Sequence, residues 1–247
     1  MVALNDKILE VRANKFRRLC GISNDAPIDF EKLLTSLDVL TVFRPLTGEF
    51  SGMALKTKNS NFMMVNTNVS VGRQNFTIGH ELYHLFIQDG FSFQMCNAGK
   101  FDKKNKEEYN ADSFSSYFLM PEAGIIKQIP EEELAWGGEL SLATVVKLEQ
   151  YFGVSRTAML IRLHKIGLLR KDYSNWKKDI TKSALEYGFS DKLYKKTGEE
   201  YVVGNYGFKA KELFDNGIIS ESHYNSLMYD INIDIENPNV VDDEQEI

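Results

Sequence analysis

The chain has 247 residues, a formal net charge of −6 and only two cysteines. Its length allows one large domain, or a smaller domain with an appendage, and its cysteine content excludes a disulfide-stabilised secreted scaffold. No apolar run is long enough to span a bilayer and none at the N-terminus has the pattern of a secretion signal, so we expect a cytoplasmic protein with no membrane partner.

The N-terminal part of the sequence changes from a helical pattern to a strand pattern. Residues 5–20 and 28–37 carry apolar residues at helical spacing, which predicts two helices. Three short segments rich in β-branched or aromatic residues follow, at 39–45, 51–56 and 61–67, and they predict a small antiparallel sheet. This order indicates the α+β class. If a metal cleft lies beside the sheet, one of these strands is expected to hold an extended peptide by strand addition.

The next segment, FTIGHELYHLF at residues 76–86, contains an HExxH pattern inside an apolar run. Residues four apart lie on one face of a helix, so His80 and His84 can bind one ion together. HExxH is typical of zincins, in which both imidazoles bind Zn²⁺ and the glutamate acts on the attacking water as a base. We therefore predict His80 and His84 as metal ligands and Glu81 as the catalytic base.

A catalytic zinc site needs a third protein ligand, which thermolysin-type enzymes take as a glutamate from a following helix. The next predicted helix covers residues 107–121 and begins with Glu107 and Glu108. We favour Glu108, because Asp112 lies one turn further along the same face and can accept a hydrogen bond from a ligating histidine. The choice between the two adjacent glutamates stays open at this point.

These two segments resemble the ImmA/IrrE family of metallopeptidases, whose motifs are HELGH followed by E-x-x-A-N/D-x-F-A-x-x-L-L-M-P. The corresponding stretches here are RQNFTIGHELYHLF and EYNADSFSSYFLMP. The second motif is matched at Glu108, Ala111, Asp112, Phe114, Leu119, Met120 and Pro121. Tyr83 stands where the family has glycine, which would narrow the cleft, and Phe118 replaces a leucine. The resemblance covers residues 5–170, more weakly outside the two motifs.

The resemblance implies a zincin-like, thermolysin-type core over residues 1–135. It also implies a zinc-dependent endopeptidase that cleaves a helix-turn-helix repressor or antitoxin, relieving repression in a mobile element, a phage or a stress response. The alternative is a metal-binding toxin or regulator that acts by binding protein or DNA rather than by proteolysis. No residue identifies itself as the stabiliser of the oxyanion, for which Tyr109 and Tyr117 are candidates.

Helical spacing over 141–152 and 155–168, with Gly153 between them, predicts a helix-turn-helix-like hairpin spanning residues 136–171. Its second half carries five basic residues and no acid, namely Arg156, Arg162, Lys165, Arg170 and Lys171. An exposed basic face of this kind can meet acidic groups on a protein partner or the phosphates of DNA. We favour a hairpin packed on the catalytic domain, with a solvated basic face, over a hairpin that binds DNA, because residues 1–229 carry a net charge of only +1.

The rest of the chain carries no chemistry that we recognise. Residues 172–229 are more polar and predict further helices near 175–187, 206–215 and 220–229. The segment 230–247 holds seven acidic residues without Lys or Arg, and we expect a disordered acidic tail.

Three remaining residues could be mistaken for metal ligands. Cys96 lies in a polar loop between the two metal-bearing helices, and we interpret it as an ordinary free thiol rather than as a thiolate that caps the zinc. His164 and His223 lack the spacing of ligands.

Overall fold

The computed structural model describes residues 6–48, 50–96, 98–102, 104–135, 139–169, 173–231, 233 and 235, apart from the Gln94 side chain. The α+β class is confirmed, since a five-stranded sheet is combined with helices over most of this range. None of the described helices is both long and apolar enough to cross a membrane. Most of the predicted acidic tail, including all of 236–247, lies outside the described residues.

The helices comprise the predicted ones, which differ mainly at their ends, and two short ones between residues 122 and 134 that the sequence does not predict. They are α1 (Asp6–Leu19), α2 (Phe30–Ser36), α3 (Val71–Phe86), α4 (Lys106–Leu119), α5 (Glu122–Gln128), α6 (Glu131–Leu134), α7 (Leu142–Phe152), α8 (Arg156–Lys165), α9 (Ile180–Glu186), α10 (Tyr206–Asp215) and α11 (Glu221–Tyr229). Side-chain caps fix several starts: Asn105 accepts a hydrogen bond from the Glu108 amide, and Ser155 accepts one from the Ala158 amide. Gly153 ends α7 in the left-handed conformation, at φ 64°, which glycine adopts without strain.

The sheet is mixed, which corrects the predicted antiparallel sheet. Its strands are β1 (Val39–Arg44), β2 (Gly52–Lys56), β3 (Asn61–Asn66), β4 (Phe93–Cys96) and β5 (Tyr201–Val203), in the order β4-β2-β3-β1-β5. Only β2 and β3 form a hairpin; β1 pairs with β3 in parallel, with Val39 opposite Asn61. Three short consecutive strands predict a meander, whereas here the chain crosses over after β1, so that β2 lies on the far side of β3.

Neither sheet edge is one of the three predicted strands. One edge is β4, which pairs antiparallel with β2, and the other is β5, which pairs antiparallel with β1. Both edge strands come from segments in which the sequence predicts no strand. An extended peptide therefore meets β4 or β5 first, unless one of them moves.

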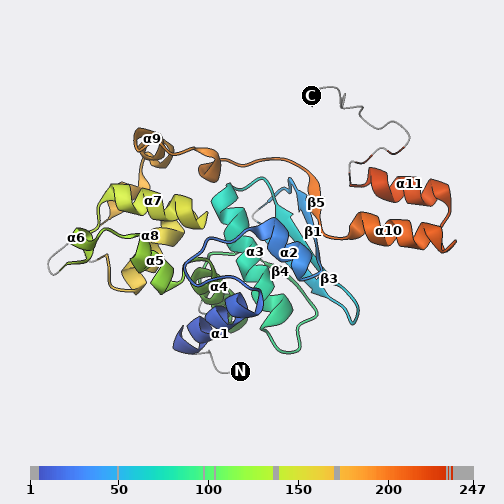
Figure 1. The fold of residues 1–247 in the computed structure, drawn as a ribbon, viewed down its shortest axis with the longest axis horizontal. Helices are drawn as coiled ribbons and strands as arrows, with labels where there is room; N and C mark the ends of the chain where they lie inside the picture. Colours follow the sequence, from blue (N-terminus) through green and yellow to red (C-terminus); the bar gives the residue numbers. More distant parts are fainter. Residues whose placement is uncertain are drawn as a thin grey trace, which may run out of the picture.

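Helices α3 and α4 lie side by side at the centre of the molecule, with α3 packed on β2 and β3 and α1 on α4 (Figure 1). The close approach of α3 and α4 depends on Gly79, where an added Cβ would lie 2.6 Å from the Ser115 Oγ. Ser115 in turn donates to the Phe76 carbonyl at 2.8 Å. The two helices predicted to carry the site are thus held in register by small side chains.

The hairpin α7–α8 lies at one end of the molecule, and its predicted basic face is wrong (Figure 1). The Arg156 guanidinium is buried against Glu149, with Nε 2.5 Å from Oε2. Arg162 is buried as well and pairs with Glu10 at 2.9 Å, while Lys165 pairs with Asp6 at 3.0 Å. Arg170 and Lys171 lie outside the described residues. Arg156 therefore joins the two helices of the hairpin, whereas Arg162 and Lys165 hold the hairpin to α1.

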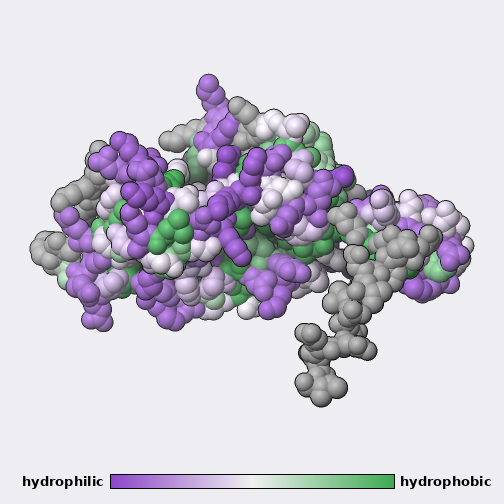
Figure 2. All heavy atoms as spheres, turned by 90° about the horizontal axis from the view of Figure 1, so that it is seen from above, coloured by the Kyte–Doolittle hydropathy of each residue, from purple (hydrophilic) through white to green (hydrophobic). Residues whose placement is uncertain are grey.

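The C-terminal region extends the molecule at the opposite end. After β5, helices α10 and α11 pack on each other, with the Phe214 and Tyr224 rings stacked at 5.2 Å (Figure 1). Seen from above, most of the coloured surface is hydrophilic and the apolar patches are small (Figure 2). The predicted division into four parts stays a prediction, although β5 shows that the region after residue 171 contributes to the central sheet.

Candidate metal centre

The site begins with the buried face of α3. Residues 76–85 of this helix are all buried, including both histidines and Glu81, because α3 lies between the sheet and α4. His80 and His84 are four positions apart on α3, and this spacing brings their Nε2 atoms to 3.1 Å from each other. The two imidazoles therefore aim at one point, as a shared ion requires.

Glu108 reaches the same point from α4. Its carboxylate lies 3.5 Å from the His80 Nε2 and 3.3 Å from the His84 Nε2. These contacts lower the pKa of Glu108, although burial opposes the shift. Two imidazole nitrogens and a carboxylate oxygen are donors that suit zinc.

The neighbouring Glu107 turns away from the cluster. Its Oε2 accepts a hydrogen bond from the Tyr83 hydroxyl at 2.8 Å. The Tyr83 ring is buried and packs on Phe114 at 5.7 Å, so the larger residue at this position is accommodated in the core. Of the two adjacent glutamates, the structure brings only Glu108 to the histidines.

Asp112 orients His80, as the position one turn beyond Glu108 predicts. Its Oδ1 lies 2.8 Å from the His80 Nδ1 and also accepts the Gly99 amide at 2.7 Å, while Oδ2 accepts the Phe101 amide at 2.6 Å. With Nδ1–H donating to the carboxylate, the Nε2 lone pair of His80 is free for a metal. His84 is oriented in the same way, with Nδ1 2.5 Å from the Gln88 Oε1.

Cys96, for which the sequence favours an ordinary free thiol, belongs to the same cluster. It is buried at the end of β4, and its Sγ lies 3.7 Å from the Glu108 Oε1. Ligand atoms of His80, His84, Cys96 and Glu108 all lie within 4.8 Å of one another. Burial raises the pKa of the Cys96 thiol, although the neighbouring His80 imidazole acts in the opposite direction.

Glu81 lies beside this cluster and is fully buried. Within the described part of the chain, neither of its carboxylate oxygens accepts a hydrogen bond. Burial raises its pKa to about 6, although His80 and His84 act in the opposite direction. A buried carboxylate without a partner is costly to keep, and it is explained if a ligand of the site supplies the missing hydrogen bond.

Tyr109 and Tyr117, the two candidates for stabilising the oxyanion, make their described contacts with residues outside the metal cluster. Tyr117 packs under the Arg162 guanidinium, 4.7 Å from its ring centroid, and interacts with Asp6 on α1. The Tyr109 ring contacts Phe101 at 6.4 Å. The residue that stabilises an oxyanion thus stays unassigned.

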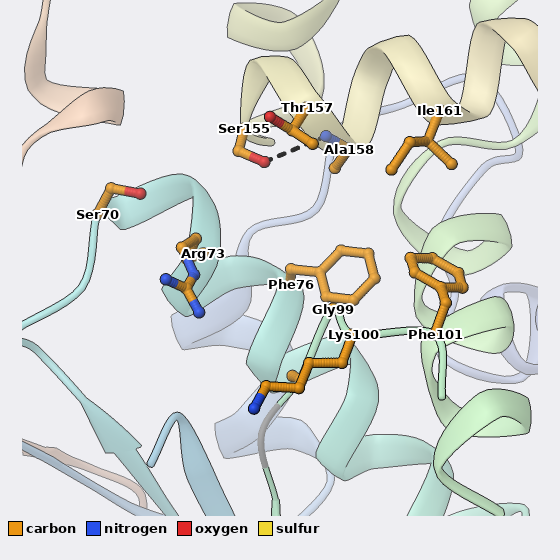
Figure 3. Close-up of a pocket in the computed structure, with 11 residues that line it drawn as sticks. Ser70, Arg73, Phe76, Gly99, Lys100, Phe101, Ser155, Thr157, Ala158 and Ile161 are labelled. Atoms are coloured by element: carbon orange, nitrogen blue, oxygen red, sulfur yellow. Dashed lines mark hydrogen bonds between the residues drawn. The ribbon is translucent and has the colours of Figure 1, made fainter. Parts of the chain in front are cut away.

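A pocket of about 330 Å³ borders the loop that follows Cys96, and none of the four cluster residues lines it. Figure 3 shows the residues that line this pocket. Its walls come from the first half of α3, the start of α8 and the loop after Cys96, through residues such as Arg73, Phe76, Gly99, Lys100 and Thr157. Gly99 and Phe101 belong both to this wall and to the backbone that Asp112 holds. The pocket and the cluster therefore share one loop.

Glu108→Ala is expected to remove most of the bound metal, whereas Glu107→Ala is expected to keep it. Loss of a ligand should weaken zinc by more than the roughly 10–100-fold that follows from changing an orienting residue. Metal content after gel filtration, together with competition against a chelator, measures the difference. If the Glu107 variant loses the ion and the Glu108 variant keeps it, the assignment on α4 is wrong.

Comparison with known proteins supports the peptidase motif. The sequence model of one family, Peptidase_M78, described as the IrrE N-terminal-like domain, matches residues 34–164. No curated protein sequence matches the chain. A solved Mycobacterium tuberculosis transcriptional regulator is similar with 15% identity and a TM-score of 0.42, over 67% of this chain and 48% of that one. The chain thus spans about half the length of that regulator.

Proposed function

Because the chain belongs to the family of IrrE N-terminal-like peptidase domains, we propose that it is a zinc-dependent endopeptidase of the zincin-like, thermolysin type. His80, His84 and Glu108 would hold the ion, and their donor chemistry fits zinc. A zinc ion bound there polarises a peptide carbonyl and lowers the pKa of a water molecule.

The observation that carries this proposal is Glu81. A fully buried carboxylate without a hydrogen-bond partner, beside two imidazoles and a second carboxylate, is a base held ready for a proton. In the proposed reaction, the Glu81 carboxylate accepts a proton from the attacking water. It then delivers this proton to the amine nitrogen of the leaving peptide. Asp112 and Gln88 keep the two imidazoles in the orientation that leaves each Nε2 free.

We further propose that the substrate is a helix-turn-helix repressor or antitoxin, cut at a specific site so that repression is relieved. This part rests on the family resemblance. The setting would be the cytoplasm, since Cys20 and Cys96 are both free thiols. The basic hairpin face that the sequence suggested as a docking or DNA surface supports neither partner, because Arg156 and Arg162 are buried.

The alternative function is a metal-binding toxin or regulator that acts by binding. One observation favours it: Cys96 adds a fourth protein donor, and a site closed by four protein ligands is typical of structural zinc. The two functions differ in whether Glu81 is needed for activity.

The proposed reaction is expected to give one discrete cut in the helix-turn-helix regulator encoded by an adjacent reading frame. The cut should fall in a loop or a frayed helix end, where the backbone can be extended. The measurement is mass spectrometry of the regulator after incubation with the zinc-loaded chain, with a chelated sample as the control. An intact regulator, when zinc occupancy has been verified, would count against this substrate.

A further inference from the structure

Strand β4 occupies the place beside the metal cluster in which an extended peptide would lie. It pairs antiparallel with β2, with Gly52 opposite Cys96 and Leu55 opposite Phe93. Glu81, the proposed base, lies next to β2 at Gly52, since a Cβ built on Gly52 would lie 3.3 Å from the Glu81 Oε1. Without β4, the exposed edge of the sheet would be β2, and a peptide added to that edge would pass directly in front of Glu81.

Cys96 is delivered into the cluster by this pairing. Side chains alternate along a strand, and the exposed Phe93 and Met95 therefore leave Cys96 on the opposite face, where it is 2% exposed. Backbone hydrogen bonds hold both ends of the strand, from the Ser51 amide to the Cys96 carbonyl at 3.1 Å and from the Lys56 amide to the Ser92 carbonyl at 2.7 Å. The sulfur is thus positioned by a sheet edge rather than by a free loop.

We propose that Cys96 is a fourth metal ligand and that β4 is a built-in strand that closes the site until a peptide replaces it. This inference rests on the proposed function only for the second half; the ligation can be tested without any peptidase activity. Thiolate sulfur is a good zinc ligand, and its coordination releases the thiol proton to solvent.

The strand is suited to leave. It has four residues, and its two large apolar side chains are already exposed, at 52% for Phe93 and 61% for Met95, so these two side chains lose little burial when the strand detaches. A substrate strand would form the same ladder with β2 and thereby compensate for the lost hydrogen bonds. What the peptide must displace in addition is the bond between Cys96 and the metal.

The ligation is tested with cobalt in place of zinc. The cobalt-loaded chain is expected to show a sulfur-to-cobalt charge-transfer band in the near ultraviolet, which Cys96→Ala loses. Cys20→Ser is the matched control, because Cys20 is the other cysteine of the chain and lies outside the cluster. The Cys96 variant should also bind zinc roughly tenfold or more weakly in chelator competition. A wild-type chain that binds cobalt without the band would overturn the proposal.

The closing role is tested with a crosslink between the two strands. Met53 and Met95 lie opposite each other, so Met53→Cys with Met95→Cys, in a Cys20→Ser background, can form a disulfide that holds β4 on β2. Oxidation is expected to stop peptide cleavage and to preserve the cobalt band, and a phosphine reductant should restore cleavage. Met53→Cys alone is the control. Undiminished cleavage by the crosslinked chain would show that β4 need not move.

Discussion

Glu81→Gln is expected to abolish peptide hydrolysis while the metal content and the melting temperature stay at wild-type values. An amide cannot accept the proton of the attacking water, and general base catalysis contributes about 10²–10⁴-fold to such reactions. Glutamine has nearly the same shape and removes a buried carboxylate that lacks a partner, so the packing of α3 against the sheet is preserved.

The measurement is the rate of appearance of regulator fragments at equal zinc occupancy. Glu107→Gln is the matched control: it makes the same chemical change in a carboxylate that binds Tyr83 and lies outside the cluster. If Glu81→Gln and wild type act equally well, the enzyme is not a peptidase that uses this base. The binding function would then be the better description of the chain.

The second large effect is expected on stability, from Glu149→Ala. This change leaves the Arg156 guanidinium fully buried with its charge uncompensated, whereas now two of its nitrogens bind the Glu149 carboxylate. Breaking a buried pair in this way costs about 3–5 kcal/mol, which corresponds to a fall of roughly 6–20 °C in the melting temperature. The hydrogen bond from Tyr194 to Glu149 would be lost as well.

Thermal unfolding followed by circular dichroism measures this effect. Lys182→Ala is the control, because it breaks an exposed pair with Glu186 in the adjoining helix and should cost at most about 1 kcal/mol. Replacing Glu149 and Arg156 together by Leu and Met should recover much of the stability. Equal melting temperatures for Glu149→Ala and Lys182→Ala would contradict a structural role for the pair.

The metal helix and its partner could be predicted because their information is local. His80 and His84 need only the period of a helix, and Glu108 and Asp112 repeat that spacing on α4. Spacing to Asp112 favours Glu108, but the position of Glu107 depends on a contact with Tyr83, which no spacing along the chain contains. The sequence therefore predicts which side chains can act as donors, but it does not predict the contact that turns the adjacent Glu107 away from them.

The place of Cys96 in the cluster could not be predicted, for a different reason. The strand Phe93–Cys96 is short and forms only because β2, some 40 positions earlier, offers an edge. A four-residue segment has too little periodicity to predict a strand. Pairing over such distances is decided by tertiary packing, which therefore also decides that the Cys96 Sγ lies in the cluster.

The prediction of an exposed basic face on α8 was wrong, although the sequence contains a pattern that indicates burial. Arg156 shares its face with Met159, Leu160 and Leu163, at the spacing i, i+3, i+4 and i+7 that marks a buried stripe. The basic charges of α8 suggest an exposed face, but the apolar spacing around Arg156 indicates that this face is buried. The acid that compensates Arg156 lies on the preceding helix, at Glu149.

The sheet edge formed by β5 has a consequence for how the chain is made. Thr41 of β1 pairs with Val203, which follows it by 162 positions, so during synthesis β1 has one unpaired edge until the segment that forms β5 has left the ribosome. Contacts between such distant residues slow folding, and an open strand edge invites pairing with another chain. The nascent protein thus passes through a stage in which its central sheet is incomplete and prone to pair with other chains. This stage ends when β5 pairs with β1.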